Sequence, residues 1–373
     1  MQPRDWPVPY TKAHSMTSLL DQSPFSAAEL TELDARIARL LGTHDDIVVV
    51  QAEAIATLEA VARSIAAPDA IAVNVVTGPY GALFGDWMRA AGATVVDLVT
   101  ELDRVVSAAE VAAVLDATPG VGILSLVHAE AATGGTNPVE AIARLAAERG
   151  IVTVLDAVAS IGAEPVDVVG WGIDVTVIGG QKSLAGPAGV SAAAVSARAW
   201  QLIEANPAAP RGSFLSLLDL RRAWLLSERT AVFGTPNTLE SRALAEALDR
   251  VAVEGGLDAV TDRHARAARA IRAALAPLGL QSWQRGPTGF APVVTTVRVP
   301  ETPFDEQAAL GGIVSRGNGE LAGRLVRVNH TGRAATVGAI LGAVDQLAVA
   351  TGVSARVRQE ARVAALAGWD VEE

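Results

Sequence analysis

The stretch Asp174-Val-Thr-Val-Ile-Gly-Gly-Gln-Lys-Ser183 carries the most direct information on fold and chemistry in this sequence. Its pattern predicts a buried β-strand that ends in two glycines and is followed by a lysine. Lys182 is one of only two lysines in 373 residues. An arginine does not deprotonate in a protein, whereas a desolvated lysine can become a neutral amine that attacks a carbonyl group. Lys182 is therefore either such a nucleophile or a residue that caps a loop.

Length and composition limit the class of protein. Half of the 373 residues are hydrophobic, so the chain can bury a large core and is expected to divide into unequal domains. A net charge of −11 argues against nucleic acid or an anionic membrane as partners. The absence of cysteine excludes disulfides, thiolate metal sites and cysteine nucleophiles, and fits a reducing compartment. We expect a cytoplasmic protein with neither a signal peptide nor a membrane span.

Apolar runs alternate with amphipathic segments along the first half of the chain. Strands are predicted at 47–50, 70–75, 94–99, 121–127, 152–155 and 175–178. Helices are predicted at 27–41, 54–66, 81–91, 107–115 and 138–149. This alternation indicates an α/β fold with a mostly parallel central sheet covered on both faces. In such sheets, chemistry gathers where the strands end, and Glu53, Asp156 and Lys182 each follow a predicted strand.

The pattern changes near residue 235. Long helices rich in Ala, Arg and Glu are predicted at 239–254 and 262–278, separated strands at 293–299 and 325–328, and a helical C-terminus. We therefore predict an N-terminal segment (1–25), a large cofactor-binding domain (26–234) and a smaller C-terminal α+β domain (235–373).

Asp156 and Lys182 suggest a specific chemistry. They lie 26 residues apart in the sequence, and each follows an apolar strand of the same predicted sheet. A carboxylate at one strand end can keep a pyridine nitrogen protonated while a nearby lysine forms an imine with the aldehyde of the same ring. Pyridoxal chemistry requires both functions, because the protonated ring accepts electrons and the lysine moves the proton. The alternative is that Asp156 is a turn residue.

The flanking sequence resembles class V aminotransferases, which belong to fold type I of the pyridoxal-phosphate enzymes. The resemblance spans roughly residues 26 to 350 and implies both that fold and transaminase activity. It rests on Val154-Leu-Asp-Ala-Val-Ala-Ser-Ile-Gly162, Trp171-Gly-Ile-Asp174, Gly180-Gln-Lys-Ser-Leu-Ala-Gly-Pro-Ala-Gly189, Val127-His-Ala-Glu-Ala-Ala-Thr-Gly134, Thr235-Pro236 and Leu325-Val-Arg-Val-Asn-His-Thr-Gly332.

The resemblance implies roles for individual residues. Lys182 would form the imine, Asp156 would pair with the pyridine nitrogen, and Tyr80 would stack on the ring. Arg327 would bind a substrate carboxylate through its planar fork. Further cofactor-binding residues implied in this way are Ala54, His128, Thr133, Gln181 and Thr235. Plainer roles stay open for Tyr80 as a packing residue, Arg327 as a salt-bridge partner and His128 as a structural histidine.

One departure from the family concerns the phosphate. Ordinary members bind it with a hydroxyl-rich loop at a helix N-terminus, whereas this chain has Gln51-Ala-Glu-Ala54. Glu53 would be stabilised by the same N–H groups and helix dipole. It would also repel a phosphate dianion at about 4 Å by on the order of a kcal/mol or more. Such a glutamate is expected in family members that use unphosphorylated pyridoxal and pyridoxamine as substrates, with a small 2-oxo acid such as pyruvate. Alternatively, Glu53 is an ordinary N-terminal helix acid.

Other departures leave the substrate site less defined. Ala131 and Ala132 occupy positions where relatives carry a hydroxyl near the ring 3-oxygen. Asn318 falls where a second substrate arginine is expected, and Arg316 is the candidate to replace it. No histidine or acidic spacing suggests a metal, so none is predicted. The family resemblance also implies a homo-oligomer that acts on small molecules, with Thr235 near the partner's site.

Three functions remain open from the sequence. The first is a transaminase that moves an amino group between pyridoxamine and a 2-oxo acid. The second is a conventional class V aminotransferase of the alanine or serine–glyoxylate type, or a related lyase, with bound pyridoxal phosphate. The third is a non-catalytic protein that buffers a B6 vitamer, against which the presence of both Lys182 and Asp156 argues.

Overall fold

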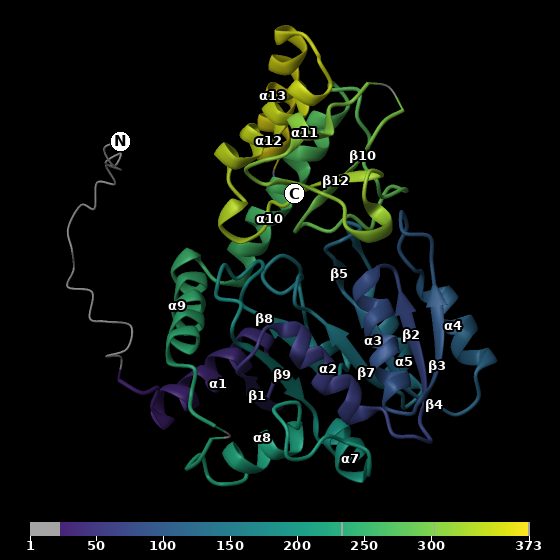
Figure 1. The fold of residues 1–373 in the computed structure, drawn as a ribbon, viewed down its shortest axis with the longest axis vertical. Coiled ribbons are helices and arrows are strands. Elements are labelled where there is room, and N and C mark those ends of the chain that lie inside the picture. The colour runs from purple at the N-terminus through teal and green to yellow at the C-terminus, as the bar shows by residue number, and fades with distance from the viewer. Residues whose placement is uncertain (1–22, 233, 302, 372–373) are drawn as a thin grey trace, which may run out of the picture.

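The computed structural model describes residues 23–232, 234–301 and 303–371 (Figure 1). Of the predicted N-terminal segment 1–25, residues 1–22 therefore lie outside the described residues. The strands are β1 (Asp46–Val50), β2 (Ile71–Val76), β3 (Thr94–Val99), β4 (Val121–Val127), β5 (Ala129–Glu130), β6 (Gly135–Thr136), β7 (Val152–Asp156), β8 (Val175–Gly179), β9 (Ser191–Val195), β10 (Thr295–Arg298), β11 (Val314–Arg316) and β12 (Leu325–Val328).

The helices fill most of the remaining chain. They are α1 (Ala27–Leu41), α2 (Ala54–Ile65), α3 (Pro79–Ala90), α4 (Ala108–Ala117), α5 (Val139–Glu148), α6 (Val168–Trp171), α7 (Ala197–Ala205), α8 (Leu217–Trp224), α9 (Thr238–Glu254), α10 (Leu257–Leu275), α11 (Glu306–Ala309), α12 (Val337–Ala350) and α13 (Ala355–Asp370). Each strand and helix predicted before residue 180 is present, with its ends shifted by no more than two residues.

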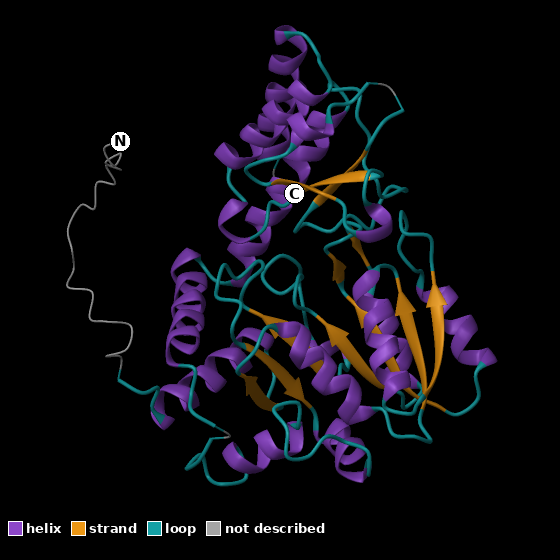
Figure 2. Ribbon diagram, viewed as in Figure 1, coloured by secondary structure: helices purple, strands orange, loops and turns teal. Residues whose placement is uncertain are grey.

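The larger sheet, whose strands are among those drawn in orange in Figure 2, has the order β1-β9-β8-β7-β4-β2-β3. Strands β8, β7, β4, β2 and β3 pair in parallel, and β9 runs antiparallel to both β8 and β1. The predicted mostly parallel sheet is thus confirmed. Because β1 runs in the same direction as β7 and β8, the residues that follow these three strands lie along one edge of the sheet.

Helices cover both faces of this sheet. Successive side chains of a strand point to opposite faces, so neighbouring residues of one strand pack against different helices. In β2, Val73 and Val75 pack in the hydrophobic cluster that contains α1, α4, α5, α6 and α9. Ala72 packs in the other cluster, with α2, α3, α7 and α8. The alternation places a complete apolar layer on each side of the sheet, which holds the strand ends in fixed positions.

A smaller antiparallel sheet lies in the C-terminal part, with the order β10-β12-β11. Helices α10, α12 and α13 form its hydrophobic cluster. Helix α10 begins at Leu257 rather than at the predicted residue 262, because Gly255 and Gly256, both with positive φ, separate it from α9. Helix α9 packs against the larger sheet through Leu244. The domain boundary at residue 235 stays a prediction.

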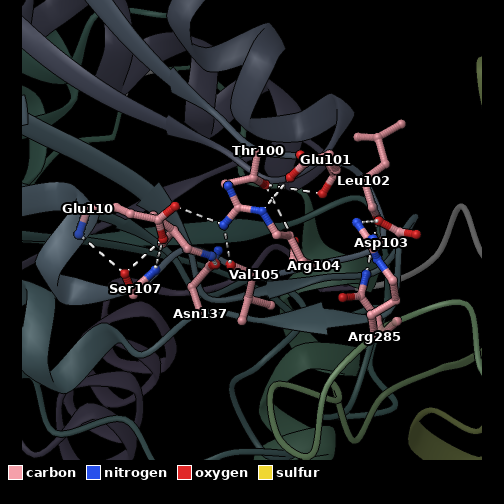
Figure 3. Close-up of polar contacts among 12 residues, drawn as sticks. Thr100, Glu101, Leu102, Asp103, Arg104, Val105, Ser107, Glu110, Asn137 and Arg285 are labelled. Atoms are coloured by element: carbon pink, nitrogen blue, oxygen red, sulfur yellow. Dashed lines mark hydrogen bonds and ion pairs between the residues drawn. The ribbon is translucent and has the colours of Figure 1, made fainter.

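Residues 100–106, which follow β3, link the part of the chain that forms the larger sheet to the C-terminal part (Figure 3). The Arg285 guanidinium pairs with Asp103 at 2.7 Å, and the backbone N–H of Arg285 donates to the Asp103 carbonyl. Asn137 accepts from the Val106 N–H at 3.3 Å and donates to the carbonyl of Val127, the last residue of β4. The same segment thus contacts both the C-terminal part and a strand end near the site.

In the part of the chain that the structure describes, no helix combines the length and the apolar character needed to cross a membrane.

Candidate active site

A cavity lies where the parallel strands end, and five of the predicted site residues line it: Glu53, Ala54, Tyr80, Asp156 and Lys182. The structure therefore brings together side chains that are up to 129 positions apart in the sequence, since residues 53 and 182 share the cavity. The remaining lining residues, Ile55, Leu58, Val127, Ala129, Ala131, Val158 and Ala159, are apolar. An apolar cavity with a few charged groups is typical of a site for a flat organic ligand.

Lys182 lies in the turn after β8, and the segment that follows β12 helps to fix that turn. A Cβ added at Gly332, which has φ +57°, would lie 2.7 Å from the Lys182 carbonyl oxygen. The Gly332 N–H donates to Nε2 of His264 at 2.9 Å. Nδ1 of His264 therefore carries the proton and donates to the Val260 carbonyl at 2.7 Å. The approach of the two backbones requires glycine here and anchors the lysine turn to α10.

Asp156 is the last residue of β7. Its Oδ1 accepts the Val158 N–H at 2.9 Å. Burial raises the pKa of Asp156 to about 6, although the Val158 N–H and the positive charge of Lys182 oppose the rise. A cation placed against this carboxylate would relieve the cost of its burial. The protonated nitrogen of a pyridine ring is such a cation.

Glu53 caps the N-terminus of α2 at the far side of the cavity. One carboxylate oxygen accepts the Ile55 N–H at 2.9 Å, and the other accepts a hydrogen bond from the Gln181 side-chain amide. The helix N–H group that would otherwise receive an anion is therefore occupied by the protein's own carboxylate. Ala54, which follows, is buried and adds no polar group.

Tyr80 is the second residue of α3, and its ring is 37 % exposed at the cavity. Burial raises the pKa of its phenol, and the negative charge of Glu130 raises it further. Arg327 acts in the opposite direction and so lies within electrostatic range of Tyr80. The ring therefore faces the cavity from the first turn of α3.

Four of the predicted cofactor-binding residues lie outside the described lining of the cavity: His128, Thr133, Gln181 and Thr235. His128 is buried, with Nε2 at 3.5 Å from the Glu164 carboxylate, and burial lowers its pKa to about 4. Thr133 donates to the Thr77 carbonyl at 3.3 Å. The carbonyl of Thr133 accepts hydrogen bonds from Gln284 and Thr296 of the C-terminal part. Their roles toward a ligand stay predictions.

The side chains of the two candidate carboxylate-binding arginines lie on opposite faces of the smaller sheet. Arg327, in β12, lies opposite Thr296 of β10 and Ser315 of β11, so these three share one face of the smaller sheet. Thr296 donates to the Thr133 carbonyl in the separate β5–β6 hairpin, so this face is directed toward the site. Arg316 lies on the other face, where its guanidinium pairs with Glu306 at 3.0 Å. Arg327 Nε donates to the Arg316 carbonyl at 3.2 Å, but the Arg316 guanidinium stays on the opposite face with Glu306.

The sequence did not single out two buried acids next to the site. Glu130, in β5, is completely buried, and burial raises its pKa to about 8. Glu164 accepts a hydrogen bond from Thr136 at 2.6 Å, and burial raises its pKa to about 7. For Glu130, the available signal was the Val-His-Ala-Glu run at 127–130, where β4 ends, but the burial of a glutamate cannot be predicted from that run.

The residues present fit a pyridoxal ring better than its phosphate. Asp156 offers a buried carboxylate to a ring nitrogen, Lys182 an amine to an aldehyde, and Tyr80 a flat face. The corner where a phosphate would lie instead holds the Glu53 carboxylate. Among the described residues, no group of three or more His, Asp or Glu is arranged to hold a metal ion.

A lysine and an aspartate at neighbouring strand ends of a mostly parallel sheet fit an enzyme of fold type I, the fold of the aminotransferases to which this structure is similar. The family model for class V aminotransferases matches residues 9–300. The chain belongs to the class V aminotransferase family, whose members use pyridoxal phosphate. The family and the fold expected from the sequence motifs are thereby confirmed.

Among curated relatives, pyridoxamine–pyruvate transaminase of Mesorhizobium japonicum is 32% identical over 323 residues, covering 85% of this chain and 81% of the relative. The crystal structure of pyridoxamine-pyruvate aminotransferase from Mesorhizobium loti covers 95% of this chain and 92% of its own, with a TM-score of 0.87 and 31% identity. Ureidoglycine-glyoxylate aminotransferase of Bacillus subtilis has a TM-score of 0.83 at 25% identity, with 92% and 90% coverage.

Proposed function

We propose that this enzyme transfers an amino group between pyridoxamine and a small 2-oxo acid such as pyruvate, giving pyridoxal and an amino acid. The unphosphorylated vitamer is then a substrate that enters and leaves. The observation that carries the proposal is Glu53, which occupies the anion-binding N-terminus of α2 inside the cavity. The similarity to two pyridoxamine–pyruvate transaminases supports the same function.

The chain supplies each function that such a transfer needs. Pyridoxal chemistry supplies a ring that accepts electrons when its nitrogen is protonated. Asp156 holds that proton at the ring nitrogen, and Lys182 provides the amine that attacks the aldehyde and moves a proton between carbon atoms. Tyr80 orients the ring by stacking. Glu53 accepts a hydrogen bond from the 5′-hydroxyl, and Arg327 receives the substrate carboxylate.

Glu53 provides the direct test. In the Glu53→Gly variant, the Ile55 N–H becomes free and the negative charge is lost, so affinity for pyridoxal phosphate is expected to rise at least about tenfold. Affinity for pyridoxal is expected to fall, because its hydroxyl loses an acceptor. The measurement is an absorbance titration of wild type and variant with pyridoxal, pyridoxamine and their phosphates.

The matched control is Glu59→Gln, which removes a carboxylate from the same helix at a position paired with Arg63. Its ratio of affinities for the two vitamers should equal that of the wild type. The proposal is overturned if wild-type protein binds pyridoxal phosphate at micromolar concentration and pyridoxal only far more weakly, or if Glu53→Gly leaves the ratio unchanged.

Arg327 is expected to determine binding of the 2-oxo acid. Arg327→Lys keeps the charge but loses the planar fork, so KM for pyruvate should rise about tenfold, with a smaller change in kcat. Arg316→Lys serves as the matched control, since Arg316 lies on the opposite face and pairs with Glu306. Steady-state kinetics at varied pyruvate would measure both. A larger KM effect from Arg316 would assign the carboxylate site to that residue instead.

A conventional class V aminotransferase, of the alanine or serine–glyoxylate type, or a related lyase is the second candidate. Relatives that include 2-aminoethylphosphonate–pyruvate transaminase 2 of Burkholderia lata, at 28% identity over 87% of this chain, favour it. In that case, Glu53 would turn away from the phosphate. The vitamer titration separates the two functions.

The metabolic role, the cellular compartment and the oligomeric state are also proposals. Consumption of an unphosphorylated B6 vitamer would fit a step in vitamin B6 degradation. The cysteine-free chain fits the cytoplasm. We further propose a homodimer or homotetramer, in which Thr235, outside the described lining of its own cavity, would face the site of a partner.

A further inference from the structure

The geometry points to Glu130 as a positioning residue that fixes Tyr80 over the vitamer ring. The inference deepens the proposed function, on which it rests, but it concerns ring binding and not the choice between phosphorylated and unphosphorylated vitamer. Neither the family resemblance nor the similarity to solved structures assigned Glu130 a role.

Glu130 lies in the β5–β6 hairpin and has no solvent-exposed surface. Its Oε1 accepts the Ala132 N–H at 3.3 Å, while Oε2 has no hydrogen-bond partner within the described part of the chain. A buried carboxyl with one unpaired oxygen costs free energy unless a neighbouring group stabilises it. The position of Glu130 therefore calls for a specific partner.

Gly78 lies directly against this carboxyl. A Cβ added at Gly78 would come within 2.5 Å of Oε2, so only a residue without a side chain allows the approach. Gly78 is the N-cap residue of α3 and makes no side-chain hydrogen bond. Pro79 has no N–H, so Tyr80 carries the first free N–H of the helix. The Tyr80 N–H lowers the pKa of the Glu130 carboxyl, against the larger rise that burial causes.

The hairpin thus places a carboxyl against the N-terminus of α3, which has no side-chain cap of its own. A carboxyl at a helix N-terminus interacts favourably with the free N–H groups and the dipole. Since Tyr80 is the second residue of α3, the contact fixes the backbone from which its ring extends into the cavity. A shift of this turn would move the ring relative to the bound pyridine.

Glu130 also belongs to the charge system of the site. Burial raises its pKa to about 8, and the negative charge of Asp156 adds to the rise. Lys182 lowers the same pKa. The carboxyl therefore lies within electrostatic range of both residues that react with the ring, although it does not line the cavity in the described structure. Its influence on the ligand passes through Tyr80.

A double-mutant cycle tests whether Glu130 acts on vitamer binding through Tyr80. Loss of ring stacking in Tyr80→Ala is expected to weaken vitamer binding about three- to tenfold, because such contacts are worth about 0.5–1.5 kcal/mol. Glu130→Ala should produce a loss of similar size. The double variant should bind no more weakly than Tyr80→Ala alone, since both changes remove the same interaction. Glu130→Gln keeps the size of the side chain and a polar oxygen against the N-terminus of α3, and should bind within about threefold of wild type.

The measurement is the absorbance titration of each variant with pyridoxal and with pyridoxal phosphate. Because the cycle can be completed with whichever vitamer binds, it stays informative if the proposed substrate is wrong. Thr136→Val is the matched control, because it changes another residue of the same hairpin and breaks its hydrogen bond to Glu164. Any loss of affinity that it causes should add to the loss in Tyr80→Ala. Additive losses for Glu130→Ala and Tyr80→Ala, in variants that circular dichroism shows to be folded, would overturn the inference. Wild-type affinity in Glu130→Ala would do the same.

Discussion

Transamination is expected to fall by at least about 1,000-fold when Lys182 is replaced by alanine. The reason is that one side chain provides both the amine that attacks the aldehyde and the group that moves the proton, and proton transfer alone typically contributes 10² to 10⁴. Initial rates of pyridoxal formation from pyridoxamine and pyruvate would measure the loss. The absorbance change that pyridoxal causes in the wild type should disappear as well.

The control for Lys182 is arginine, because Lys182→Arg preserves the positive charge next to Asp156 and removes only the nucleophile. Both variants should therefore lose activity to a similar extent. A small primary amine such as methylamine should restore part of the rate in Lys182→Ala, where space is created, and much less in Lys182→Arg. Activity within tenfold of wild type in Lys182→Ala would show that another group performs the chemistry, as would full activity in Lys182→Arg.

The sequence predicted the strand ends that carry Glu53, Asp156 and Lys182, because apolar strands and amphipathic helices leave strong periodic signals. It did not predict β9, whose sequence Ser-Ala-Ala-Ala-Val has a single β-branched residue and no aromatic one to mark a strand. β9 pairs between β8 and β1 and runs against both. The proximity of Glu53 to Lys182 across this strand is thus a property of strand order, which no local pattern encodes.

Contacts between distant segments were also beyond local patterns. The Gly-Pro-Tyr run at 78–80 predicted a helix start with an aromatic residue, but not that Gly78 is required by the side chain of Glu130. Similarly, Arg316 was the candidate for a second substrate arginine beside Arg327. Their strands pair so that they lie on opposite faces of the smaller sheet, and Glu306 already binds Arg316. In both cases, the decisive fact is which face of a strand a residue occupies.

Asp156→Asn is expected to lower kcat about 100-fold or more, comparable to the loss of one preorganised electrostatic partner of a transition state. The amide has nearly the same shape but no charge, so it cannot keep the ring nitrogen protonated, and the ring then accepts electrons poorly. Affinity for pyridoxamine should fall about tenfold or more, because a charge-assisted hydrogen bond is lost. Rapid mixing of pyridoxamine-loaded enzyme with pyruvate would separate the chemical step from binding.

The pH dependence gives Asp156 a distinct signature. Its pKa is raised to about 6, so the carboxyl carries a proton at pH 5 and a negative charge at pH 7. A cationic ring favours the charged form, and pyridoxamine binding by the wild type should therefore strengthen as pH rises from 5 to 7 and level off above. Asp156→Asn should lack this step, whereas Asp167→Asn, at the cap of α6 and away from the cavity, should retain it. If Asp156→Asn keeps the step, a different group titrates, and Asp156 is not the partner of the ring nitrogen.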